Sequence, residues 1–442
     1  MIPGSKFGSL LRWYGQLLTW VQRLSAYRTL SAGSEKDPQK INESQVAREL
    51  HLRQIVRWIA ERATALDNGS GFLDELCTKL RAEGLPLWRV SVVVPAIDPS
   101  VRGFSIDWQR ERGTSLLSVA YGDGIIDAFE RSPVYALLAE GRTFARWRLN
   151  DKLCPTRPIP ALVDLHAEGG TDYVLHLIWF APGTALKGVA VSFATDAPSG
   201  FNDQDVAMVA EVLPSLGLAM CKFSLSRTLH ETLGIYLGSE TSSRVLNGNI
   251  RRGEGETVAA AILLADFRAF TALADRDDPV KVVGWLDEHF DAVGEPIARC
   301  GGEILKFTGD GFLGIFRVQE PENQSSTICG MALDAAVQAL SLNHALNDRR
   351  RSTGLPELEV DLVLHFGDVV YGNVGASRRL DFTVIGRAVN EASRIEELCD
   401  RVCRSILVSD TFAERCGRPL ELIGSFVLRG LERKQQIWAP LG

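Results

Sequence analysis

The sequence predicts an α+β fold in two successive units, and three observations support it. Helical patterning over about 45–83 precedes a set of short runs rich in β-branched and aromatic residues. A long apolar helix follows at 200–220, and a second series of buried strands and helices begins near residue 255. The 442 residues are enough for two or three domains with sizeable cores.

Composition excludes several classes of protein. The formal net charge is −7, which argues against a nucleic-acid binder because such proteins usually present a basic stripe. The eight cysteines are scattered, and even the closest pair, Cys399 and Cys403, is no CxxC motif. This usage predicts a reduced, cytoplasmic protein and argues against a zinc site. No apolar run reaches the roughly 18 residues that a membrane-spanning helix needs.

Residues 1–45 are predicted to form an amphipathic helix and a polar linker. Apolar residues recur at helical spacing among basic ones, at Leu10, Tyr14, Leu17, Val21 and Leu24. Such a helix over residues 1–30 either lies on an anionic membrane surface or packs on its own protein or a dimer mate, and we favour packing. Charges interrupt the apolar residues and no clear cleavage site follows, so a signal peptide is not predicted.

Residues 46–220 are predicted to form a small α+β domain. Four runs between the helices have strand composition and are bounded by Pro, Gly or Asp: 89–94, 103–108, 173–180 and 188–193. The closing helix at 200–220 begins with Asn202 or Asp203 as N-cap. Helix, antiparallel strands and a long closing helix are typical of a sensor module.

The stretch PSGFNDQDVAMVAEVLPSLGLAM, at 198–220, resembles the closing segment of GAF domains. The resemblance implies a GAF-like regulatory domain, whose input is a small molecule or a protein that the residues do not identify. Residues 221–254 extend the helix until Gly234 and Gly238 break it. This segment either transmits rotation between the domains or is a passive spacer.

An acidic residue ends the first strand of the second unit. Residues 258–265 are an apolar run that predicts a buried strand, which ends at Asp266 and turns into a helix. A carboxylate is a hard ligand for Mg²⁺, and the backbone N–H groups of residues 267–271 would point at phosphates, which makes Phe267 a candidate substrate-binding residue. The alternative is that Asp266 is only an N-cap.

A second acid lies in a hairpin. EILKFT and FLGIF alternate like two strands, and Gly-Asp-Gly at 309–311 makes the turn. Asp310 is either a plain turn former or, with Asp266, half of a pair that shares two divalent ions for phosphoryl chemistry. Lys306 has apolar neighbours and needs a carboxylate or a ligand as partner. The preceding GGEIL resembles the GG(D/E)EF motif of cyclic di-GMP synthases, but that motif needs two acids in its turn.

A third block, at 372–399, contains a strand LDFTVIG and a helix RAVNEASRIEELC. Asn390 and Arg394 are four residues apart and lie on one face of this helix. One interpretation makes Arg394 a solvated partner of Glu397 or Glu391. The other points Asn390 and Arg394 at a bound nucleotide.

Taken together, ADFRAFT, ILKFTGDGFLGIF, GNVG and DFTVIGRAVNEASRIEE resemble the class III nucleotidyl cyclase catalytic domain, over residues 255–442. The resemblance implies a ferredoxin-like, palm-type βαββαβ sheet. It matches Asp266 and Asp310 to two metal-binding aspartates and Lys306 to the base-selecting lysine. Thr383 matches the second base-selecting position, which is aspartate in many adenylyl cyclases and threonine or serine in subgroup IIIb.

The remaining roles follow from the same resemblance. Asn390 matches the ribose-orienting asparagine, and Arg394 matches the transition-state arginine. The phosphate-contacting lysine near the C-terminus has no clear counterpart, and Arg429 in LRGLERK is the candidate stand-in. Each active site would bind two Mg²⁺ or Mn²⁺ ions and lie between two protomers of a homodimer, since the chain has one copy of each motif.

Base chemistry favours ATP. A lysine ammonium only donates and suits adenine N1, while a threonine oxygen accepts from N6. The implied activity is adenylate cyclase, which makes 3′,5′-cyclic AMP and pyrophosphate. Guanylyl or mixed activity stays open because the hydroxyl of Thr383 both donates and accepts. A catalytically silent nucleotide-binding regulator is the other alternative, although all six motif positions are filled. The subgroup also suggests bicarbonate as an activator.

Overall fold

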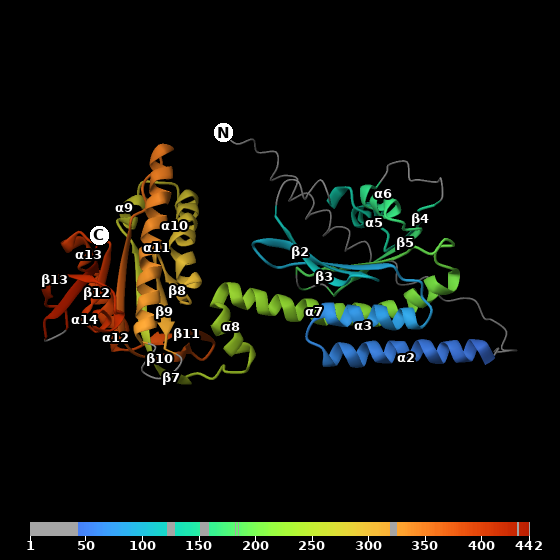
Figure 1. Ribbon diagram of the computed structural model, residues 1–442, viewed down its shortest axis with the longest axis horizontal. Helices are drawn as coiled ribbons and strands as arrows, with labels where there is room; N and C mark the ends of the chain where they lie inside the picture. Colours follow the sequence, from blue (N-terminus) through green and yellow to red (C-terminus); the bar gives the residue numbers. More distant parts are fainter. Residues whose placement is uncertain are drawn as a thin grey trace.

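The computed structural model describes residues 43–441 apart from 122–128, 151–158, 182, 184, 319–324, 431 and 432. The amphipathic helix predicted within residues 1–45, and its membrane contact, lie outside the described residues. Figure 1 shows two β-sheets toward opposite ends of the molecule, connected by the helices α7 (Asp203–Leu237) and α8 (Ser239–Leu246).

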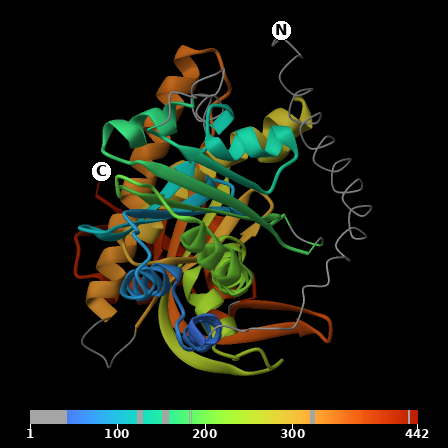
Figure 2. The ribbon, with the colours of Figure 1, turned by 90° about the vertical axis from the view of Figure 1, so that its right-hand side faces the viewer.

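The first unit is α+β, as the sequence predicts. Its six-stranded sheet has the order β3-β2-β1-β6-β5-β4, and all neighbouring strands are antiparallel. The elements are α2 (Glu43–Ala65), α3 (Gly69–Ala82), β1 (Arg89–Pro95), β2 (Val101–Gln109), β3 (Gly113–Ala120), α5 (Pro133–Glu140), β4 (Phe144–Arg148), α6 (Pro160–Ala167), β5 (Asp172–Trp179) and β6 (Gly188–Thr195). Viewed end on, α2, α3 and α7 lie on one side of the sheet, with α5 and α6 on the other (Figure 2).

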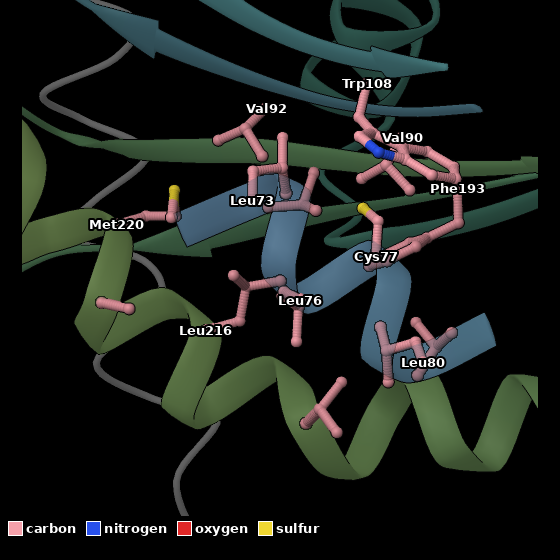
Figure 3. Close-up of a cluster of buried hydrophobic side chains, with 14 of the residues drawn as sticks. Leu73, Leu76, Cys77, Leu80, Val90, Val92, Trp108, Phe193, Leu216 and Met220 are labelled. Atoms are coloured by element: carbon pink, nitrogen blue, oxygen red, sulfur yellow. The ribbon is translucent and has the colours of Figure 1, made fainter. Parts of the chain in front are cut away.

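Apolar side chains from α3, α7 and the sheet form one core. Figure 3 shows Leu73, Leu76 and Leu80 of α3 between Leu216 of α7 and the strands. These leucines are at most 1% exposed, and full burial of one such side chain contributes roughly 1.5–3 kcal/mol. The core therefore packs α7 against the sheet from Val209 to Phe223.

The closing helix is longer than the sequence predicts. Asn202 is the N-cap, and its Oδ1 accepts from the N–H groups of Gln204 and Asp205 at 2.8 and 2.9 Å. The predicted break at Gly234 is wrong, because α7 continues to Leu237 and ends only at Gly238, whose φ is +83°. A single glycine costs a helix about 1 kcal/mol, which neighbouring turns tolerate. The predicted boundary at residue 220 therefore falls inside one helix.

The length of α7 also corrects the expectation about membrane-spanning segments. Among the described residues, α7 is the helix that is long and apolar enough to cross a membrane, by length and composition only. Its apolar residues include Val209, Val212, Leu216 and Met220, which are buried in the core of the first unit. Packing on the sheet accounts for these four residues, whereas Leu218, Leu225 and Leu229 of the same helix are exposed.

The second unit contains an eight-stranded sheet in the order β13-β14-β12-β10-β7-β9-β8, with β11 paired to β10. Its strands are β7 (Gly255–Phe267), β8 (Glu303–Thr308), β9 (Gly311–Arg317), β10 (Val360–Ala376), β11 (Arg379–Ile385), β12 (Ile406–Ser409), β13 (Leu420–Phe426) and β14 (Gln435–Pro440). Its helices are α9 (Phe270–Ala274), α10 (Pro279–Arg299), α11 (Ser325–Ser352), α12 (Arg387–Glu396), α13 (Cys399–Val402) and α14 (Asp410–Cys416). The strands β7, β8, β9 and β10 with α10 and α11 make the predicted βαββαβ arrangement.

The two faces of this sheet bury different helices. Along β7, Ala261, Leu263 and Ala265 join a core with α11, while Ala260 and Ile262 join a core with α12. Side chains alternate along a strand, so Asp266 follows Ile262 and Leu264 on the α12 face. The fold thus positions the predicted acid on the same face as the helix that bears Asn390 and Arg394.

Candidate active site

The turn that bears Asp310 closes against the end of β7. Ala265 pairs with Phe312, so Asp266 lies beside the start of β9. A Cβ at Gly311 would lie 2.3 Å from the Ala265 carbonyl oxygen and 3.0 Å from Asp266 Oδ1. Only glycine permits this approach, and it brings the two predicted acids, Asp266 and Asp310, to one corner of the sheet.

The electrostatics of this corner favour a cation. Burial raises the pKa of Asp266 to about 6, and the negative charges of Asp310 and Asp361 add to the effect. Mg²⁺ is commonly bound by one or two carboxylates, with waters and substrate phosphates completing its shell. Two carboxylates that repel each other fit that pattern. Asp266 and Asp310 therefore remain the candidate ligands, although the described residues contain no group of three or more His, Cys, Asp or Glu side chains arranged to hold a metal ion.

Further charged residues surround this pair, and sequence reasoning missed them. Asp361 lies opposite Asp266 in the β10–β7 register and is 5% exposed. The guanidinium of Arg268 binds the Asp361 carboxylate, with Nε 3.1 Å from Oδ2. Burial and the charge of Asp266 raise the pKa of Glu396, on α12, to about 7. An aspartate inside the apolar run VDLVLH was the available signal for Asp361.

Lys306, on β8, and Thr383, on β11, each offer a polar group without a partner among the described residues. A β-bulge between Ile304 and Lys306 precedes the pairing of Lys306 with Leu313. Lys306 is exposed, and within the described part of the chain it has no ion-pair partner. Thr383 is 5% exposed, and its Oγ1 has no hydrogen-bond partner among the described atoms. A buried hydroxyl without a partner costs roughly 1–3 kcal/mol, which a ligand that bonds to it would recover.

Asn390 and Arg394 lie on α12, as predicted. Arg394 Nη1 donates to Glu397 Oε1 at 2.7 Å, so the ion pair proposed as the plain alternative is present in the single chain. Both side chains are more than a third exposed, and such surface pairs contribute about 0–1 kcal/mol. This pair is too weak to prevent Arg394 from turning to a ligand.

The side chain of Phe267 has a packing role, and the predicted contact of its backbone N–H with a phosphate stays a prediction. Its side chain is 3% exposed and packs with Val282 and Trp285, and it pairs with Val360 as part of β7. The predicted series of free N–H groups is also interrupted, because the Arg268 N–H donates to the Glu359 carbonyl oxygen at 3.0 Å. The strand continues one residue past Asp266, and the following helix α9 has only five residues. Phe267 therefore contributes packing behind Asp266.

Within one chain, Arg429 lies on the opposite side of the sheet from the hairpin that bears Lys306 and Asp310. It is exposed in the turn between β13 and β14. The sheet order places β13 and β14 at the edge opposite β8 and β9. The structure also has a cavity of about 530 Å³ between α10 and α11, and another of about 410 Å³ beside Arg268. Neither cavity is lined by any of the six motif side chains, which are Asp266, Lys306, Asp310, Thr383, Asn390 and Arg394.

Comparisons with known proteins find similar sequences over the second unit. Residues 254–435 match the family model of the adenylate and guanylate cyclase catalytic domain. The chain is 33% identical over 193 residues to an adenylate cyclase of Anabaena cylindrica, and 30% identical over 157 residues to adenylate cyclase 1 of Rhizobium meliloti. These matches cover 43% and 35% of this chain but only 36% and 23% of the two relatives.

Two solved structures resemble different lengths of the chain. The adenylyl cyclase CyaB from P. aeruginosa is 24% identical, with a TM-score of 0.39, over 43% of this chain and 96% of that one. A bacterial light-regulated adenylyl cyclase is 15% identical, with a TM-score of 0.44, over 80% of this chain and 93% of that one.

Proposed function

Since residues 254–435 form a class III adenylyl/guanylyl cyclase catalytic domain, we propose that the protein is an adenylate cyclase that converts ATP into 3′,5′-cyclic AMP and pyrophosphate. One observation supports this most directly. The fold brings Asp266 and Asp310 to one corner of the sheet, while Lys306 and Thr383 keep their polar groups unpaired for a base.

Base choice rests on hydrogen-bond chemistry. The ammonium of Lys306 donates to adenine N1, and Thr383 Oγ1 accepts from the N6 amino group. Guanine presents an N1–H donor, which a lysine cannot accept. The Thr383 hydroxyl, unpaired in the structure, also donates, which keeps GTP as the second candidate substrate. The two named relatives above are both adenylate cyclases.

The reaction would be an in-line attack of the ribose 3′-oxygen on the α-phosphorus. Asp266 and Asp310 would hold two Mg²⁺ or Mn²⁺ ions, which when bound lower the charge on the triphosphate and favour the deprotonated 3′-oxygen. Asn390 orients the ribose. Arg394 neutralises the charge that develops on the α-phosphoryl oxygens, and it must first leave Glu397.

A homodimer with two equivalent sites is part of the proposal. Neither of the two cavities described above is lined by a motif residue. The β10–β11 arm exposes Val370, Val374, Leu380 and Ile385. An exposed apolar surface of this kind marks an interaction site. Asp266 and Asp310 would come from one protomer, with the base-selecting pair, Asn390 and Arg394 from the other.

We further propose that the first unit is a GAF-like regulatory domain in a cytoplasmic protein. Its helix–sheet–helix order and the resemblance at 198–220 support the first part. The seven described cysteines are all free, which suits a reducing compartment.

The direct test is an assay of the purified full chain with Mn²⁺ and either ATP or GTP. We expect cyclic AMP from ATP, at a rate well above cyclic GMP from GTP. A protein that binds ATP without turnover would instead be the silent regulator.

Lys306→Glu should cost ATP turnover more than GTP turnover, because glutamate cannot donate to adenine N1 but accepts from guanine N1–H. The measurement is kcat/KM for each nucleotide. Lys281→Glu, at an exposed position on α10, is the matched control for charge. Equal losses on both substrates would show that Lys306 does not select the base.

Deleting residues 1–225 should change the specific activity, since α7 enters the catalytic unit without a break until Gly238. The measurement is the specific activity at saturating ATP, and it also shows whether the deletion raises or lowers that activity. An unchanged rate in a protein that remains dimeric would make the first unit a passive partner.

A further inference from the structure

The N-terminus of α8 is capped by a residue from the catalytic sheet. Its N-cap is Gly238, which has no side chain to satisfy the first N–H groups. Glu303 takes that role, because its Oε1 accepts from Thr241 N at 3.3 Å and from Thr241 Oγ1 at 3.2 Å. A carboxylate at a helix N-terminus is also favoured by the helix dipole. Glu303 is the first residue of β8, so this contact connects α8 to the catalytic sheet.

The other oxygen of this carboxylate reaches β10. Tyr371 donates its hydroxyl to Glu303 Oε2 at 2.9 Å, and its side chain is fully buried. Burial, followed by the charge of Glu303, raises the pKa of Tyr371, so the phenol remains a neutral donor. The guanidinium carbons of Arg244 and Arg317 lie 4.9 and 4.7 Å from its ring centroid. Cation–π contacts therefore hold the ring from α8 and from β9.

An ion pair also fixes α8 to β9. Glu240, in the first turn of α8, binds Arg317 Nη2 at 3.0 Å and Arg244 Nε at 3.3 Å. These charges lie around the Tyr371 ring. The cluster of Glu240, Thr241, Arg244, Glu303 and Tyr371 is referred to below as the α8 junction.

The α8 junction adjoins both base-selecting strands. Glu303 lies three residues before Lys306 on β8, and the β-bulge lies between them. A bulge sets the face to which the next side chain points, so an anchored Glu303 defines the orientation of Lys306. On the other strand, the Phe382 ring meets Tyr371 edge-on at 4.6 Å, and Phe382 is next to Thr383.

We propose that Glu303 is a positioning residue for base selection, which fixes β8 and β11 to α8 so that Lys306 and Thr383 face one adenine. The inference rests on the proposed function and deepens it. It also gives a role to the acid of GGEIL, which the cyclase motifs leave without one. The resemblance to the cyclase family assigns no role to Glu303 or Tyr371.

The test measures KM and kcat for ATP and for GTP in the full-length protein. Glu303→Ala should raise KM for ATP about tenfold, the size expected for losing hydrogen bonds to a charged group, and should reduce the preference for ATP over GTP. The value of kcat should change much less, because the metal-binding pair and Arg394 are untouched. Glu303→Gln keeps an acceptor oxygen for Thr241 and should restore most of the ATP preference.

Two further variants complete the design. Tyr371→Phe removes one hydrogen bond and keeps the buried ring, so it should shift the ATP preference in the same direction without loss of folding. Glu421→Ala, on β13, removes a carboxylate whose partner among the described residues is Arg404, at 3.2 Å, and should leave KM and preference unchanged.

The outcomes separate this inference from the proposed function. A wild-type protein without cyclase activity would overturn the proposed function and the inference with it. An active wild type whose Glu303→Ala variant matches Glu421→Ala would overturn the inference alone. Equal losses of kcat for ATP and GTP at constant KM would make Glu303 merely structural. If Glu303→Ala does not fold, as judged by thermal melting, an unchanged ATP preference in Tyr371→Phe contradicts the proposal.

Discussion

Asp310→Ala is expected to lower the rate of cyclic AMP synthesis by on the order of 10³-fold, to near background. The change leaves Asp266 as the single candidate ligand at the corner of the sheet. Among the described residues, no third side chain completes a metal-binding group there. Removing the Asp310 charge should also lower the pKa of Asp266, since that charge is one of the causes that raise it.

The controls for this variant are straightforward. Asp310 lies in a turn and is partly exposed, so its loss should not unfold the protein. Thermal melting without metal should be close to wild type, and Asp287→Ala on the exposed side of α10 should retain full activity. Asp310→Asn, which keeps the shape but not the charge, should be nearly as inactive. Activity above about a tenth of wild type in either variant would rule Asp310 out as a metal ligand.

Arg394→Ala is expected to lower kcat by roughly 10²-fold or more, with little change in KM. The guanidinium acts on charge that appears mainly in the transition state, so its loss affects the chemical step rather than ATP binding. The cost to stability should be small, because the exposed pair with Glu397 contributes little.

The chain supplies a close control on the same helix. Arg387 also lies on α12, is exposed and binds an acidic side chain, with Nε 2.5 Å from Glu391 Oε1. Arg387→Ala should leave kcat within a factor of about two, as expected for a surface ion pair. Equal losses in the two variants would show that helix stability, and not the position of Arg394, determines the rate.

The parts of the fold that the sequence predicts are those with strong local patterns. The apolar run before Asp266 became β7, and the Gly-Asp-Gly turn became the β8–β9 hairpin. By contrast, β3 exposes Leu116 and Leu117 side by side, so it lacks the alternation that marks a strand. Gly234 did not end its helix, because helix ends depend on tertiary packing as well as on propensity.

The residues of the candidate site also differ in whether a local sequence pattern identifies them. Asp266, Asp310, Asn390 and Arg394 became candidates because each occupies a distinctive local motif, and their roles stay predictions. The hydrogen bond between Tyr371 and Glu303 joins residues 68 positions apart. It depends on the order of the strands in the sheet, which no local sequence pattern reveals. The end of β7 at Phe267, one residue past the predicted end, was hidden for a related reason, since the length of β7 is set by its pairing with β10.

The central claim is that two protomers share each active site. Asp310→Ala supplies a chain with an intact Arg394, and Arg394→Ala supplies one with an intact Asp310. In a mixed dimer one site is whole and the other carries both defects. Random exchange makes about half of the dimers mixed, each with one of two sites working, so the mixture should approach about a quarter of wild-type activity.

The most direct measurement is therefore the rate of cyclic AMP synthesis after the two inactive variants are mixed under conditions where labelled subunits demonstrably exchange. The account predicts recovery toward about a quarter of the wild-type rate. Exchange without recovery, with the mixture remaining at the level of the single variants, would contradict it.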